Sequence, residues 1–154
     1  MSNFDSPALI EHVALLRTSY RRWTGKDLLP PGIGEVDAVR ALDDAPFAVV
    51  SHGTQTDPIF NYGNRLALRL FEMEWEEFTA LPSRLSAEPG DRDARQRLLA
   101  QVGAQGYSDN YAGVRIAKTG RRFEIGDATL WNLVDAEGGY RGQAALIRRW
   151  RPLP

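Results

Sequence analysis

Three long extended runs joined by short glycine-containing turns fill the last third of the chain, and they constrain the fold most. The runs are Tyr107 to Ala117, Arg121 to Val134 and Tyr140 to Trp150. Lys118-Thr119-Gly120 separates the first two, and Ala136-Glu137-Gly138-Gly139 separates the last two. Glycine supplies the positive backbone angles that tight hairpin turns require. The pattern therefore predicts three consecutive antiparallel strands.

Two shorter extended runs, Phe47 to Ser51 and Pro58 to Tyr62, predict the first two strands of the same sheet. Helical patterns fill the space between the second and third strands. They are a helix that starts near Arg65 after the capping residue Asn64, a short helix around Trp75 and Phe78, and a helix over Arg92 to Ala104 capped by Asp91. This order predicts an α+β fold: a five-stranded antiparallel sheet with these helices on one face.

The N-terminal segment predicts an amphipathic helix that starts at Ser6-Pro7. Its apolar stripe is Leu9, Val13, Leu16, Tyr20 and Trp23. A second helix is predicted over Glu35 to Asp44. We expect the stripe to cover the other face of the sheet, in its own chain or in a dimer partner, so self-association through this helix is a prediction. The chain divides into an N-terminal helix and connector, residues 1–34, and a sheet-containing domain, residues 35–154.

The composition narrows the classes of partner. The 154 residues include 19 lysines and arginines and 20 acidic residues, so the chain has no net positive charge to attract nucleic acid. Cysteine is absent, which excludes disulfides and thiolate chemistry and agrees with a cytoplasmic location. Met1 to Ile10 lacks the features of a signal peptide, and no apolar run is long enough to cross a membrane. We expect neither a nucleic-acid nor a membrane partner.

Particular residues make the chain resemble the PAS fold. The run Phe60 to Phe71 resembles the PAS segment in which an asparagine caps the helix after the second strand. Trp131 to Gly138, followed by Gly142, resembles the closing PAS hairpin.

Three further runs resemble the MEKHLA family more narrowly. They are Ala45 to Gly53, Asp57 to Asn64 and Leu81 to Ala87. Members of that family occur as free-standing bacterial proteins and at the C-termini of plant homeodomain–leucine-zipper transcription factors, where the domain is taken to be PAS-like and regulatory. This chain contains no homeodomain, so it resembles the free-standing bacterial kind. The resemblance implies a PAS-like sensory domain, and the sequence itself shows no recognisable catalytic machinery.

Alternation along the last two strands predicts a wall of small side chains. One face of the first of these strands carries Gly126, Ala128, Leu130 and Asn132. Alternate positions of the last strand carry Gly142, Ala144 and Leu146. The bulkier row, Phe123, Ile125, Thr129, Trp131 and Leu133, is then expected on the outside. The small wall either leaves an apolar cavity beneath the helices or permits close packing without one.

If a cavity exists, Asn132 is its predicted polar anchor, and the resemblance implies a ligand on this inner face. The predicted ligand-binding residues are Tyr62, Leu66, Leu70, Trp75, Phe78, Tyr111, Ala128, Leu130, Asn132, Gly142 and Ala144. Without cysteine, a bound flavin has no partner for a cysteinyl adduct. The Arg92 to Ala104 helix has no histidine, so the haem ligation of some PAS sensors has no counterpart there. A small organic molecule is the expected ligand, and its identity stays open.

The two histidines carry little evidence for catalysis. His12 lies beside the apolar stripe and is expected to be exposed or capping, and neither histidine has carboxylates at metal-ligand spacing. Three functions follow, in order of preference: a ligand-binding sensory domain, a dimerisation or docking module, and an enzyme that uses His52 with Asp57 or Tyr62.

Overall fold

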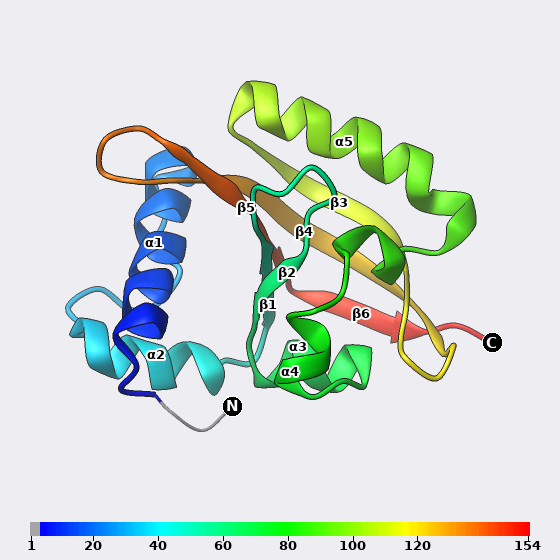
Figure 1. Ribbon diagram of the computed structural model, residues 1–154, viewed down its shortest axis with the longest axis horizontal. Coiled ribbons are helices and arrows are strands. Elements are labelled where there is room, and N and C mark those ends of the chain that lie inside the picture. The colour runs from blue at the N-terminus through cyan, green and yellow to red at the C-terminus, as the bar shows by residue number, and fades with distance from the viewer. Residues whose placement is uncertain (1–3) are drawn as a thin grey trace.

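A single antiparallel sheet of six strands forms the centre of the computed structural model, which describes residues 4–154 (Figure 1). The spatial order is β2-β1-β5-β4-β3, and β6 pairs with β4. The strands are β1 (Ala48–His52), β2 (Phe60–Gly63), β3 (Tyr107–Ile116), β4 (Arg122–Val134), β5 (Tyr140–Ile147) and β6 (Arg149–Pro152). The expected α+β fold is confirmed. Residues 1–3 lie outside the described residues. They belong to the predicted N-terminal segment 1–34 and to the run Met1 to Ile10.

Helices cover both faces of this sheet (Figure 1). On one side lie α1 (Pro7–Thr24) and α2 (Glu35–Asp43). On the other side lie α3 (Arg65–Phe71), α4 (Trp75–Phe78), the short 3-10 turns η1 (Ser83–Ser86) and η2 (Pro89–Asp91), and α5 (Arg92–Gln105). Each helix predicted from the sequence therefore forms. Among residues 4–154, no helix has the length and apolarity to cross a membrane.

The apolar stripe of α1 packs on the sheet of its own chain. Leu9, Val13, Leu16 and Tyr20 belong to one buried cluster with Trp131 and Leu133 of β4. The rings of Tyr20 and Trp131 meet edge to face with centroids 5.0 Å apart. Two polar side chains fix the same helix to the strand, because Ser19 bonds to both backbone groups of Val134 and the Trp23 indole donates to the Asn132 carbonyl. The N-terminal helix is thus part of the core.

A bulge in β4 changes which of its side chains lie on each face of the sheet. Asp127 has a φ of 52°, and the pairing of β3 with β4 shifts register there. One extra residue in a strand reverses the alternation that follows it. Phe123 and Ile125 therefore lie in the same cluster as Ala128 and Leu130, on the α5 side. The prediction that Phe123 and Ile125 lie on the outer face was wrong for this reason.

The last strand also departs from the prediction, since Tyr140 to Trp150 is not continuous. It breaks at Arg148 into β5 and β6, which gives six strands instead of five. Arg148 lies at the bulge and donates to the Asp127 carbonyl, to Thr129 Oγ1 and to the Tyr20 hydroxyl. The break in one strand therefore meets the bulge in its neighbour.

Side chains of β5 were assigned to the wrong faces as well. Ala144 pairs with Trp131, and Ala144 and Leu146 lie in the cluster under α1. Ala145 and Ile147 pack on the opposite side, with Leu130. The predicted wall placed Leu130 and Ala144 on one face because both have even residue numbers. Residues that pair across two strands share a face, and Leu130 pairs with Ala145.

One buried asparagine joins three elements. Asn64 is fully buried, and its side-chain oxygen accepts from the backbone N–H groups of Val49 and Ala67. Its side-chain nitrogen donates to the carbonyls of Leu42 and Phe47. The predicted cap of α3 is confirmed, and it also ties α2 and β1 together.

The other two predicted caps behave differently. Neither Ser6 nor Asp91 makes a side-chain capping bond. The Asp91 carboxylate instead accepts from the backbone N–H of Val114 on β3 at 2.9 Å. A tertiary hydrogen bond has thus replaced the local one.

Replacing Asn64 tests its role as this joint. We expect Asn64→Ala to lower the free energy of unfolding by about 3 kcal/mol or more, because it leaves buried backbone groups without partners. Asn64→Asp keeps the acceptor and loses both donors, so it should also destabilise the fold. Urea unfolding measures both, with Arg69→Ala on the exposed face of α3 as the control. A change in Asn64→Ala no larger than in the control would contradict the assignment.

Candidate functional site

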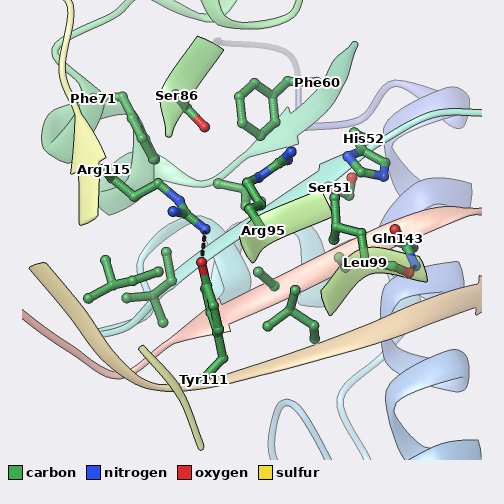
Figure 2. A pocket seen from close by; sticks show the side chains of 16 residues that line it. Ser51, His52, Phe60, Phe71, Ser86, Arg95, Leu99, Tyr111, Arg115 and Gln143 are labelled. Atoms are coloured by element: carbon green, nitrogen blue, oxygen red, sulfur yellow. Dashed lines mark hydrogen bonds between the residues drawn. The ribbon is translucent and has the colours of Figure 1, made fainter. Parts of the chain in front are cut away.

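A small cavity lies between the inner face of the sheet and α5, with a volume of about 50 Å³ (Figure 2). Most of its wall is apolar: Val50, Phe60, Phe71, Leu99, Ile125, Leu130, Ala145 and Ile147. Polar side chains from five elements also reach it: His52, Ser86, Arg95, Tyr111, Arg115 and Gln143. An apolar enclosure with a few converging polar groups is the usual composition of a ligand site.

Arg95 reaches the cavity from the buried face of α5. It is 8% exposed, and it lies one turn before Leu99 and two turns before the fully buried Val102. Its Nη2 donates to Ser83 Oγ at 3.0 Å. Arg95 is absent from the predicted ligand-binding residues, although its spacing from Leu99 and Val102 places it on the same face of the helix.

The hydroxyl of Ser83 connects Arg95 to His52. Ser83 Oγ lies 2.9 Å from His52 Nδ1 and also accepts from Arg95, so one hydroxyl contacts both side chains. Burial, and then the charge of Arg95, lower the pKa of His52 to about 4, against a weaker opposing effect of Gln143. His52 is therefore neutral at pH 7.

Arg115 enters from β3, on the same face as its partner Phe123. It is 7% exposed. Its Nη2 donates to the Tyr111 hydroxyl at 2.9 Å, the bond drawn in Figure 2, and its guanidinium lies 5.3 Å from the centre of that ring. The nearest carboxylate is that of Asp91, whose Oδ2 lies 4.0 Å from Nη1. Tyr111 and Asp91 thus hold the guanidinium at the cavity wall.

Asn132, the predicted polar anchor, forms part of a short chain of amides. Gln143 Nε2 donates to Asn132 Oδ1 at 3.1 Å and to the Leu99 carbonyl at 3.0 Å. Asn132 Nδ2 in turn donates to the Gly103 carbonyl. Gln143, and not Asn132, borders the cavity, so these amides fix α5 to the sheet behind its wall.

A second, more polar pocket of about 270 Å³ lies next to the cavity. The two share His52, Arg95, Leu99 and Gln143 as wall residues. Asp57 and Tyr140 line only the larger pocket. The shared side chains therefore stand between the inner cavity and the outer pocket.

The structure brings part of the predicted site together. Tyr111 and Leu130 border the cavity, and Ala144 also borders it, although Ala144 belongs to the cluster under α1. Leu70, Phe78 and Ala128 lie in the buried cluster around it, and Leu66 packs against that cluster. Ligand binding by these residues stays a prediction.

Tyr62 and Trp75 instead lie in the cluster under α1. A register shift in the pairing of β1 with β2 places Tyr62 opposite Ser51 and Phe60 opposite His52, so Phe60 takes the inner face. The rings of Tyr62 and Trp75 meet at 5.9 Å.

His12 was expected to be exposed or capping, and this was wrong. It is partly buried beside Tyr62, and its Nε2 lies 2.8 Å from Ser51 Oγ. Burial, and then the charge of Arg141, lower the pKa of His12 to about 4. Its role is to connect α1 to β1.

Of the two side chains proposed to act with His52, only Asp57 lines the same pocket. The Asp57 carboxylate pairs with Arg84 at 3.1 Å, and Tyr62 faces the other side of the sheet. Within residues 4–154, no three histidine or carboxylate side chains lie where they could hold a metal ion.

The backbone has known structural relatives, and they define the class of the fold. A PAS domain from Colwellia psychrerythraea matches with a TM-score of 0.63 at 18% identity, over 76% of this chain and 94% of that one. A light-oxygen-voltage domain studied with a flavin analogue matches with a TM-score of 0.61 over 77% of this chain and 85% of the other. An RNA-binding light-oxygen-voltage receptor gives 0.61 over 78% of this chain and 33% of the receptor. The fold is PAS-like.

Sequence comparison identifies the family. The MEKHLA domain profile matches residues 10–152, so the chain belongs to the MEKHLA domain family. The chain is also 26% identical over 150 residues to the homeobox-leucine zipper protein ATHB-9 of Arabidopsis thaliana. That match covers 94% of this chain and 18% of the plant protein, so the chain corresponds to a small part of that relative.

The buried histidines predict acid-sensitive stability. Both have a pKa of about 4 in the folded chain against 6.5 when solvated, so the unfolded state binds protons first as the pH falls. Stability should therefore be complete above about pH 6.5 and decline toward about pH 4, by up to about 1.4 kcal/mol per pH unit for each histidine. Urea midpoints at pH 7 and pH 5 measure this, and His52→Gln should reduce the difference. Equal midpoints at the two pH values would contradict it.

Gly142 has a structural requirement that can be tested separately. Its φ is 125°, and a Cβ added there would lie 2.1 Å from the His52 carbonyl oxygen. We expect Gly142→Ala to destabilise the fold by about 3 kcal/mol, through strain and separation of β1 from β5. Gly126→Ala is the matched control, because a Cβ at Gly126 meets nothing within 4 Å. Similar thermal midpoints for the two variants would disprove the requirement.

Proposed function

We propose that this chain is a non-enzymatic sensory or regulatory domain that binds a small organic ligand in the cavity between the sheet and α5. The observation that carries the proposal is the cavity itself, which combines apolar walls with Arg95, Arg115, Tyr111 and Gln143. Such polar groups orient a ligand while the apolar wall supplies most of its binding energy.

The size of the cavity limits the ligand. At about 10–15 Å³ for each water, a volume of about 50 Å³ holds about three to five water molecules. Pockets for drug-sized ligands are commonly about 300–1,000 Å³. A flavin does not fit this cavity, and the chain has no cysteine to form an adduct with it. A molecule of a few non-hydrogen atoms is the better match.

A regulatory role draws support from the similar proteins. One is named a homeobox-leucine zipper protein and another a light-oxygen-voltage receptor that binds RNA. In both, the matched part is a minority of the longer chain. A domain reused as one module of larger regulators is suited to sensing, with its output supplied by other parts or partners.

The alternative, a dimerisation module without a ligand, has less support. The apolar stripe of α1 is already buried against β4, with Val13 and Leu16 fully covered. A dimer formed through this stripe would have to pull α1 away from its own sheet. Light scattering of the full chain tests this, and a dimer that Leu16→Asp converts to a stable monomer would favour the alternative.

Filling the cavity tests the ligand proposal. Protein purified from its native host should carry a bound molecule in native mass spectrometry, and adding a ligand at 100 times its Kd should stabilise the fold by about 2.7 kcal/mol. We expect Ala145→Leu, which occupies the cavity, to fold and to lose this stabilisation. Ala94→Leu on the exposed side of α5 is the matched control and should keep it. If both variants respond to a ligand as the unmodified chain does, the cavity is not the site.

A further inference from the structure

Two arginine side chains and one carboxylate leave the cavity with an unbalanced positive charge. Arg95 and Arg115 are 8% and 7% exposed and both form its wall. Asp91 is 4.0 Å from Arg115, and its Oδ2 also accepts from the Val114 N–H. Among residues 4–154, no carboxylate forms an ion pair with Arg95.

This charge is not removed by loss of a proton. Burial, and then the charge of Arg115, lower the pKa of Arg95 to about 10, which leaves it cationic at pH 7. A buried charge without a counter-ion costs several kcal/mol, and proteins normally pair or solvate such groups. The ligand-free domain therefore keeps a destabilising charge where a ligand would bind.

Arg95 also has hydrogen-bond capacity in reserve. A guanidinium has five N–H donors in a planar fork, and Arg95 uses one nitrogen, for Ser83. Figure 2 shows its side chain near that of Arg115, between Phe60 above and Tyr111 below. Arg115, by contrast, is held by Tyr111 and the Val114 carbonyl. One fixed cation and one with free donors face the same space.

We propose that the cavity binds a short-chain monocarboxylate whose carboxylate pairs with Arg95 and Arg115 and whose hydrocarbon end lies against Phe71, Ile125 and Leu130. One negative charge would balance the surplus positive charge. The fork of Arg95 suits the two oxygens of a carboxylate. The cavity volume fits two to four carbon atoms. The inference rests on the proposed function and names its ligand class.

The apolar share of the wall favours a carboxylate over an inorganic anion. Phosphate or sulfate needs donors on every side, whereas one side of this cavity is lined by Phe71, Ile125, Leu130 and Ile147. A molecule with one charged end and one hydrocarbon end satisfies both parts of the wall. Phosphate is therefore a useful competitor in the test.

The experiment titrates the full chain with sodium propionate and follows thermal midpoints and amide NMR shifts, at ionic strength matched with sodium chloride. Propionamide, which has the same shape without the charge, and inorganic phosphate are titrated in parallel. We expect saturable stabilisation by propionate and at least tenfold weaker binding of the other two. Binding of phosphate as tightly as propionate would overturn the inference.

Variants connect the effect to the arginine. Arg95→Gln should remove the response to propionate while the ligand-free protein is at least as stable as before, because an unpaired buried charge is gone. Arg95→Lys keeps the charge without the fork and should bind more weakly than the unmodified chain. Arg97→Gln, on the exposed face of the same helix, is the control and should bind normally. Unchanged propionate binding in Arg95→Gln would overturn the inference.

The two proposals fail in different ways. If propionamide or another neutral molecule binds in the cavity and carboxylates do not, the charge argument is wrong and the ligand-binding function stands. The same holds if native mass spectrometry shows a co-purified neutral molecule that Ala145→Leu excludes. If neither charged nor neutral molecules bind, and none co-purifies, both proposals are overturned.

Discussion

The need to cover two apolar faces of one sheet is the constraint on which the rest of this structure depends. β4 carries Trp131 and Leu133 on one side and Leu130 on the other, and all are buried. An exposed apolar face of this size would promote association. α1 therefore belongs to the domain core, and its stripe covers one face so that α5 and the cavity occupy the other.

Irregularities in the strands decide which side chains reach that cavity. The bulge at Asp127 places Ile125 and Leu130 on the same face of the sheet. The register shift between β1 and β2 places Phe60 on that face and Tyr62 on the opposite one. A strictly alternating strand would have given the cavity a different wall. Small backbone changes thus set its size and polarity.

The polar part of the cavity comes from long-range packing. Arg95 lies on a helix and Arg115 on a strand, and the fold places both on the wall of one cavity with His52 and Gln143. The spacing of Arg95 from Leu99 and Val102 places it on the buried face of α5, but the local pattern around Arg115 does not distinguish it from a solvated arginine. Burial is what makes their charges significant, since charge effects in a low-dielectric interior are much stronger than in water.

The sequence by itself determined the helices and strands, the antiparallel connection of the last three strands, the cap at Asn64 and the family. These depend on local periodicity, turn chemistry and short motifs, which neighbouring residues encode. Tertiary structure decided the face of each residue beyond a bulge, the division of the last strand at Arg148, the burial of His12 and the meeting of Arg95 with Arg115. The reason is physical: strand alternation is a local rule that one inserted residue reverses, and burial of a charge depends on segments far away in the chain.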